Sequence, residues 1–151
     1  MSAPLLRLEH VGMRFSGLRA VDALDFSVDA GKVVGLIGPN GAGKTTVFNM
    51  ITGVYRPTDG RILWQGRDIT GAPPYRVAAL GIYRTFQTIR LFSGMTVLEN
   101  VQAGLHLKTR QQWWQGLLGT PAQRREEVDQ VAQVRALLER LDLAHCADEN
   151  A

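Results

Sequence analysis

A glycine-rich loop followed by a lysine and two threonines constrains this chain more than any other feature. Residues 38–46, Gly-Pro-Asn-Gly-Ala-Gly-Lys-Thr-Thr, satisfy the pattern G-x-x-x-x-G-K-[S/T] in full. Glycines let a backbone wrap closely around an anion with its N–H groups pointing inward. The apolar run Lys32–Ile37 before the loop predicts a buried strand, and Gly43–Thr52 after it predicts a helix with Gly53 just past its end. This order predicts a phosphate-binding loop at a helix N-terminus.

The polar side chains of this loop suit a nucleoside triphosphate. Lys44 is expected to reach the β- and γ-phosphates, and the Thr45 hydroxyl to ligate Mg²⁺. The alternative is a glycine turn that binds nothing, but that leaves the lysine and the two threonines unexplained. The candidate nucleotide-binding residues of the loop are Gly38, Pro39, Asn40, Gly41, Ala42, Gly43, Lys44, Thr45 and Thr46.

Strand and helix patterns around the loop predict one α/β domain. A length of 151 residues is typical of a single domain. The predicted strands are Leu6–Phe15, Leu24–Val28, Arg61–Trp64 and Ile82–Phe86. A short helix is predicted over Pro73–Leu80, and Thr96 with Glu99 forms a capping box for a helix that continues through Val101. A long helix is predicted from about Pro121. Its apolar stripe consists of Val128, Val131, Val134, Leu138 and Leu141.

Composition and charge exclude several classes of protein. Hydrophobic residues make up 45% and charged residues 21%, as in ordinary globular proteins. The net charge of +3 is spread without a long Lys/Arg block, so no nucleic-acid partner is expected. The N-terminus does not resemble a signal peptide, and no apolar run is long enough to span a bilayer, so membrane association is expected through a partner. The single Cys146 allows no intrachain disulfide, and with His145 it has too few ligands for structural zinc.

Several motifs together resemble the ATP-binding subunits of ABC transporters. They are the loop 38–46, the stretch Thr58–Ile62 and the sequence Arg-Thr-Phe-Gln at 84–87, which is similar to the family's Q-loop. Residues 90–92 and 95–101 resemble the subgroup that serves branched-chain amino-acid importers. The resemblance implies the N-terminal part of a P-loop NTPase cassette. This part would contain an antiparallel β subdomain, a partial RecA-like core with the Walker A helix, and a helical segment at the C-terminus.

The resemblance also implies roles for residues outside the loop. Phe15 occupies the position of an aromatic that stacks on adenine, although a core phenylalanine is the alternative. Gln87 resembles the Q-loop glutamine that contacts Mg²⁺ and the attacking water, so Thr45 and Gln87 are the implied metal contacts. Leu91, Phe92 and Met95 form either a groove for a permease helix or plain core. Trp113 and Trp114 have no assigned role.

The implied partners are transmembrane permease subunits and a second ATP-binding subunit, as a homo- or heterodimer. The implied location is the cytoplasmic face of the inner membrane, where the chain is peripheral. A GTPase is the weaker alternative, because the sequence has no Asn-Lys-x-Asp motif for guanine.

Three further motifs of the family are absent from residues 1–151: the Leu-Ser-Gly-Gly-Gln signature, a Walker B strand ending in Asp-Glu, and the switch histidine. The resemblance therefore implies a truncated cassette that binds ATP without efficient turnover. The alternative is a non-hydrolytic module that binds a nucleotide or a partner. In this class of fold the Ile82–Phe86 strand would lack an inner partner, which is an aggregation hazard.

Overall fold

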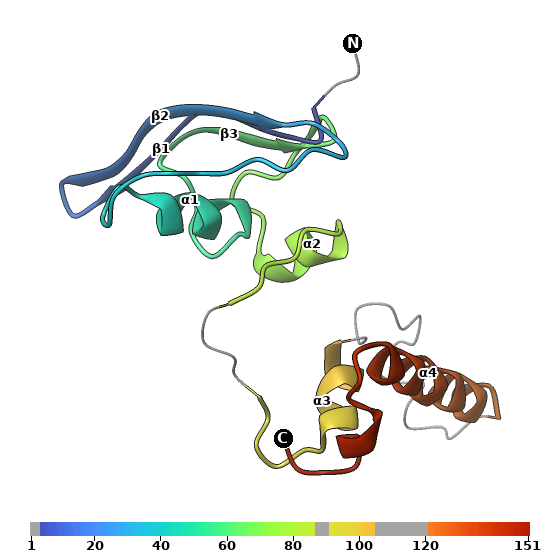
Figure 1. Cartoon of the computed structure of the whole chain (residues 1–151). Helices are drawn as coiled ribbons and strands as arrows, with labels where there is room; N and C mark the ends of the chain where they lie inside the picture. The colour runs from blue at the N-terminus through green and yellow to red at the C-terminus, as the bar shows by residue number, and fades with distance from the viewer. Residues whose placement is uncertain (1–3, 87–90, 105–120) are drawn as a thin grey trace. The chain divides into compact units, whose positions relative to one another are not determined.

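The computed structural model describes residues 4–86, 91–104 and 121–151; for residues 121–128 it describes the backbone alone. The chain divides into two compact units, residues 1–85 and 86–151, and each is considered by itself (Figure 1). Unit 1 contains β1 (Leu6–Phe15), β2 (Leu18–Val28), α1 (Lys44–Ile51), β3 (Asp59–Trp64), β4 (Arg67–Asp68) and α2 (Pro74–Ala79). Unit 2 contains α3 (Val97–Gly104), α4 (Pro121–Arg140) and the 3₁₀ helix η2 (Ala144–Cys146).

Unit 1 is built on an antiparallel sheet with the strand order β2-β1-β3-β4. The strands β1 and β2 are joined by the two-residue turn Ser16-Gly17, whose φ angles of 42° and 94° are the positive values that a tight hairpin needs. In the register of the sheet, Leu8 lies opposite Phe26 of β2 and Ile62 of β3. The strand β1 therefore lies between β2 and β3 and forms hydrogen bonds with both.

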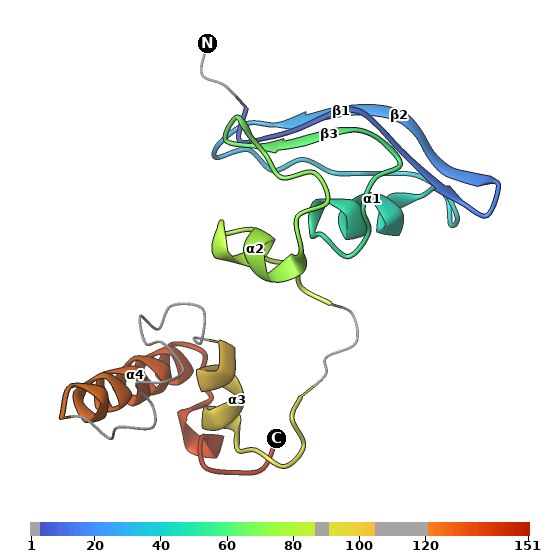
Figure 2. The same ribbon diagram turned by 180° about the vertical axis from the view of Figure 1, so that it is seen from behind.

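One face of this sheet is covered by α1, as Figures 1 and 2 show from opposite sides. The strands contribute Leu8, Val11 and Ile62 to the core, and α1 contributes Val47 and Met50; all five are buried. Burying a side chain of this size stabilises the fold by about 1.5–3 kcal/mol. The core thus fixes the helix that follows the glycine loop against the sheet.

The prediction of a buried strand at Lys32–Ile37 is wrong. After β2 the chain returns to α1 without forming a strand, and Val33 and Ile37 are essentially fully exposed (Figure 1). Extended backbone becomes a strand only when a neighbouring strand takes up its N–H and C=O groups. Among the described residues no strand pairs with this segment, so its apolar side chains remain at the surface.

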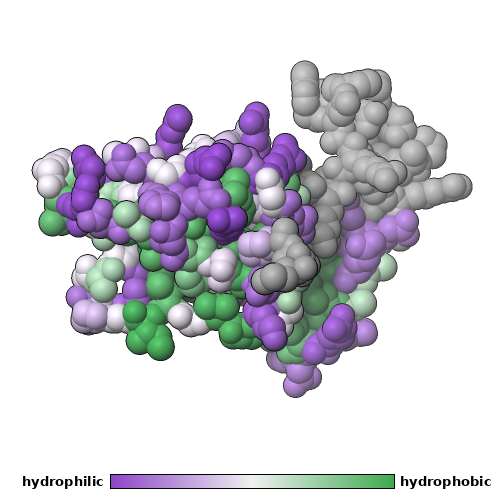
Figure 3. Space-filling model, turned by 90° about the horizontal axis from the view of Figure 1, so that it is seen from above, coloured by the Kyte–Doolittle hydropathy of each residue, from purple (hydrophilic) through white to green (hydrophobic). Residues whose placement is uncertain are grey.

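The same explanation applies to Ile82–Phe86, which was also predicted as a strand and has no regular secondary structure. Its side chains range from half-buried Ile82 to exposed Tyr83 and Phe86. Figure 3 shows hydrophobic residues at the surface among hydrophilic ones on the face that it draws. Both segments are apolar in sequence, but neither forms a strand because no neighbouring strand among the described residues takes up its hydrogen bonds.

Unit 2 is a small helical unit whose core consists of Leu98, Val134, Leu138 and Ala147. The predicted capping box is confirmed: the Thr96 N–H donates to Glu99 Oε2 (2.7 Å), and the Glu99 N–H donates to Thr96 Oγ1 (3.2 Å). In the predicted stripe of α4, Val134 and Leu138 are buried and Val131 is half-buried. Leu141 is exposed because the helix ends at Arg140, and the Val128 side chain lies outside the described part.

The helices in the described ranges are too short or too polar to cross a membrane.

Candidate functional site

The glycine loop is held against the β1–β2 hairpin at Gly43, the residue that caps the N-terminus of α1. Gly43 has a φ of 82°, in the left-handed region that side chains disfavour. A Cβ atom at this position would lie 2.4 Å from the Ala20 carbonyl oxygen of β2. Because a side chain would collide with backbone, only glycine allows the loop to approach the hairpin this closely.

The first turn of α1 directs backbone N–H groups toward the loop. The Val47 N–H is the first helical donor and bonds to the Gly43 carbonyl (2.9 Å). The N–H groups of Lys44, Thr45 and Thr46 precede it and therefore have no acceptor within the helix. No side chain caps this end of the helix. These donors and the positive end of the helix dipole favour an anion such as a phosphate.

The Lys44 ammonium group lies across the loop. Its Nζ atom donates to the carbonyl oxygen of Gly38 and to that of Pro39, the latter at 2.6 Å. An ammonium group has three N–H donors, so one remains for a phosphate oxygen. The lysine is therefore positioned to neutralise an anion that also accepts hydrogen bonds from the helix N-terminus.

The residues of the loop fit Mg²⁺ only as a partner of a phosphate. Thr45 is exposed at the start of α1, where its hydroxyl can serve as a single oxygen ligand. The described ranges contain no cluster of three or more acidic, histidine or cysteine residues that could hold a metal by itself. Mg²⁺ typically combines one or two protein ligands with water and phosphate oxygens, which agrees with this arrangement.

Phe15 lies at the end of β1 and is 37% exposed, so it is not a core residue. Its ring packs at 74° against the ring of Tyr55, with 5.3 Å between centroids. Phe15 belongs to the β1–β2 hairpin, and the Ala20 carbonyl of the same hairpin approaches Gly43. The hairpin therefore carries Phe15 and also contacts the glycine loop. The contact of Tyr55 with Phe15 was not predicted, because nothing in the local sequence around either residue indicates it.

Comparisons with known proteins match nearly the whole chain. The model of the ABC transporter family matches residues 21–151. The chain belongs to the ABC transporter family. It is 43% identical over all 151 residues to the high-affinity branched-chain amino acid transport ATP-binding proteins BraF of Pseudomonas aeruginosa and LivG of Escherichia coli K12. A solved nucleotide-free ATP-binding cassette of an ABC transporter matches 99% of the chain with a TM-score of 0.76 and 36% identity.

These relatives are longer than the chain. The chain spans 59% of the length of BraF and of LivG, and 58% of the solved cassette. The predictions of the ABC transporter family and of a P-loop NTPase fold of α/β class are confirmed.

Part of the predicted site lies outside the described residues or differs from expectation. Gln87, Trp113 and Trp114 lie outside the described ranges. Leu91 and Phe92 are exposed, which contradicts core packing for these two and leaves the groove a prediction. Cys146 is free and half-buried; its Sγ donates to the Leu143 carbonyl at 3.2 Å.

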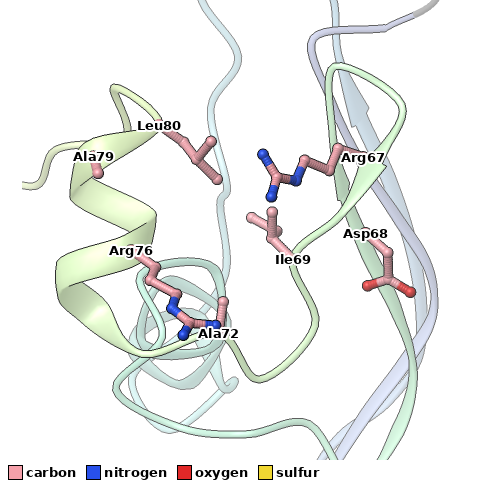
Figure 4. Close-up of a pocket in the computed structure, with 7 residues that line it drawn as sticks. All are labelled: Arg67, Asp68, Ile69, Ala72, Arg76, Ala79 and Leu80. Carbon is pink, nitrogen blue, oxygen red and sulfur yellow. The ribbon is translucent and has the colours of Figure 1, made fainter.

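A cavity of about 310 Å³ lies beside α2, and none of the residues that line it belongs to the glycine loop. In Figure 4, Arg67 and Ile69 face Leu80 across it. Asp68 also lines this cavity. Hydrogen bonds from the Thr70 side chain and backbone lower the pKa of the Asp68 carboxyl group, and the Thr70 N–H lies 2.8 Å from its Oδ1. This acid is thus engaged locally and is not part of the phosphate site.

Arg84 of this ABC transporter chain ties the segment before position 87 to α1. Its Nη1 donates to Asn49 Oδ1 (2.7 Å), and its guanidinium group lies 5.7 Å from the centre of the Phe48 ring. Both partners belong to the helix that follows the glycine loop. We therefore expect Arg84→Ala and Asn49→Ala to be non-additive in urea denaturation, with a coupling energy of about 0.5–3 kcal/mol. Additive losses of unfolding free energy would contradict the contact.

Proposed function

We propose that this chain is the nucleotide-binding part of the ATP-binding subunit of an importer for branched-chain amino acids. The observation that supports this best is the glycine loop, in which the Lys44 ammonium and the uncapped N-terminus of α1 converge. The names of BraF and LivG, which are similar over the whole chain, support the class of substrate. In this proposal the loop residues 38–46 hold the triphosphate, Thr45 and Gln87 contact Mg²⁺, and Phe15 stacks on adenine.

The proposed partners are the transmembrane permease subunits and a second ATP-binding subunit. A chain of this kind is expected to act at the cytoplasmic face of the membrane, bound through the permease. The exposed side chains of Leu91 and Phe92 are the proposed contact for a permease helix. This part of the proposal is tested by co-purification of the chain with permease subunits from membranes, where the double variant Leu91→Ser, Phe92→Ser should be lost from the complex.

The direct test of the proposed nucleotide site is calorimetric titration of the purified chain with Mg-ATP. We expect one saturable site for Mg-ATP, with binding that is not reproduced by Mg²⁺ alone. Mg²⁺ alone should give no heat of binding, because the site provides too few protein oxygens for the cation. Absence of Mg-ATP binding to a folded chain would refute the proposal.

The role of Phe15 gives a second test. Phe15→Ala is expected to weaken binding of Mg-ATP by about 1–3 kcal/mol, the scale of one lost base–aromatic contact. Phe15→Trp should retain affinity, and ADP should be weakened by Phe15→Ala about as much as ATP, since both present the same base. Calorimetry measures the affinities, and thermal denaturation provides the control. If Phe15→Ala lowers the melting temperature but leaves both affinities intact, Phe15 is a structural residue and the stacking role is wrong.

A second candidate is a module that binds nucleotide or a partner without turnover. It is favoured by one sequence observation: the only Asp-Glu pair in the 151 residues is Asp148-Glu149. This pair follows the 3₁₀ helix η2 and not an apolar strand. The Asp148 Oδ1 atom lies 3.4 Å from Arg135 Nη2. The DNA that follows codon 151 distinguishes the two candidates, because only the first requires the remaining motifs of a cassette to be encoded there.

A further inference from the structure

The contact between Phe15 and Tyr55 brings together segments that are forty residues apart in the chain and leaves both rings partly exposed. Phe15 is 37% exposed and Tyr55 is 36% exposed. Their interplanar angle of 74° is an edge contact, which occupies at most one of the two faces of the Phe15 ring. At least one face of the Phe15 ring is therefore not occupied by Tyr55.

Tyr55 is fixed by the C-terminus of α1. The helix ends at Ile51. Two positions later Gly53 has a φ of 76°, and its N–H donates to the Met50 carbonyl (3.2 Å). The Val54 N–H donates to the Asn49 carbonyl (2.8 Å), which completes a Schellman motif. The Tyr55 N–H donates to the same Asn49 oxygen (3.1 Å). The backbone of Tyr55 is therefore tied to the last turn of the helix whose first turn follows the glycine loop.

We infer that Tyr55 is a positioning residue of the base-binding part of the site. It holds the Phe15 ring in one orientation relative to α1 and so sets where a base lies when the phosphates occupy the loop. This inference rests on the proposed function, because it requires Phe15 to stack on the base. Tyr55 acts through Phe15 and does not itself contact the phosphates, which distinguishes its effect from that of Lys44.

The experiment compares Tyr55→Ala with Tyr55→Phe, which keeps the ring, in calorimetric titrations with Mg-ATP and with inorganic triphosphate plus Mg²⁺. Tyr55→Ala is expected to weaken Mg-ATP about three- to tenfold, the scale of one aromatic pair. Inorganic triphosphate has no base, so its affinity should not change. Tyr55→Phe should bind Mg-ATP like the wild-type chain. The double variant Phe15→Ala, Tyr55→Ala should bind no more weakly than Phe15→Ala alone.

Any other outcome contradicts either this inference or the proposed function. Equal Mg-ATP affinity for the wild-type and Tyr55→Ala chains overturns this inference alone. An equal loss of affinity for inorganic triphosphate also overturns it, because Tyr55 would then act on the loop or on folding. Additive losses in the double variant would assign Tyr55 a contact with the base that is independent of Phe15. A wild-type chain that does not bind Mg-ATP overturns the proposed function together with this inference.

Discussion

Replacement of Lys44 by alanine is expected to lower the affinity for Mg-ATP by about 10- to 150-fold. This range corresponds to the 1.5–3 kcal/mol typical of a hydrogen bond to a charged group. The expectation rests on the position of the Lys44 ammonium, which is held over the loop by the carbonyl groups of Gly38 and Pro39 and retains one donor for a phosphate oxygen.

A matched control for this variant is available in the same unit. Lys32 is an exposed lysine outside the loop, so Lys32→Ala removes the same charge without removing a proposed phosphate contact. Calorimetric titration of both variants with Mg-ATP measures the effect. If Lys44→Ala binds as tightly as the wild-type chain, or if Lys32→Ala weakens binding equally, the assignment of the phosphate site is wrong.

The second large effect concerns turnover. The purified 151-residue chain is expected to release phosphate from saturating Mg-ATP no faster than background, although it binds the nucleotide. Phosphoryl transfer depends on acids that hold the metal and on a residue that positions the attacking water. No Asp-Glu pair follows an apolar strand in these residues, so we expect a rate several powers of ten below the roughly 1–10³ per second typical of enzymes.

The Lys44→Ala chain serves as the control for contaminating ATPases in this assay. Turnover near once per second that persists in Lys44→Ala comes from a contaminant. Turnover of that size that disappears in Lys44→Ala would refute the prediction.

Local sequence signals predicted several elements closely, because the interactions that define them are also local. The strand at Leu6–Phe15 has the predicted limits, and the capping box at Thr96 and Glu99 forms as expected. The helix after the loop ends before Gly53, which adopts the left-handed conformation that favours glycine. In each case the deciding contacts join residues within a few positions of one another.

The segments Lys32–Ile37 and Ile82–Phe86 show where this reasoning fails. Both have the apolar composition of buried strands, and neither forms one. Strand formation depends on hydrogen bonds to another segment, so composition alone cannot predict it. The side chain of Val33 is exposed because no strand in the described residues lies beside it.

The sequence by itself predicted the chemistry proposed for the glycine loop, because the order of glycines, lysine and threonines before a helix is typical of a phosphate site. Only the tertiary structure decided which other residues join that site. It packs the hairpin of Phe15 against Gly43, ties Arg84 to Asn49 and places Tyr55 against Phe15. The contacts Ala20–Gly43, Asn49–Arg84 and Phe15–Tyr55 link positions 23, 35 and 40 residues apart. They arise because sheet pairing and the burial of α1 bring distant segments together.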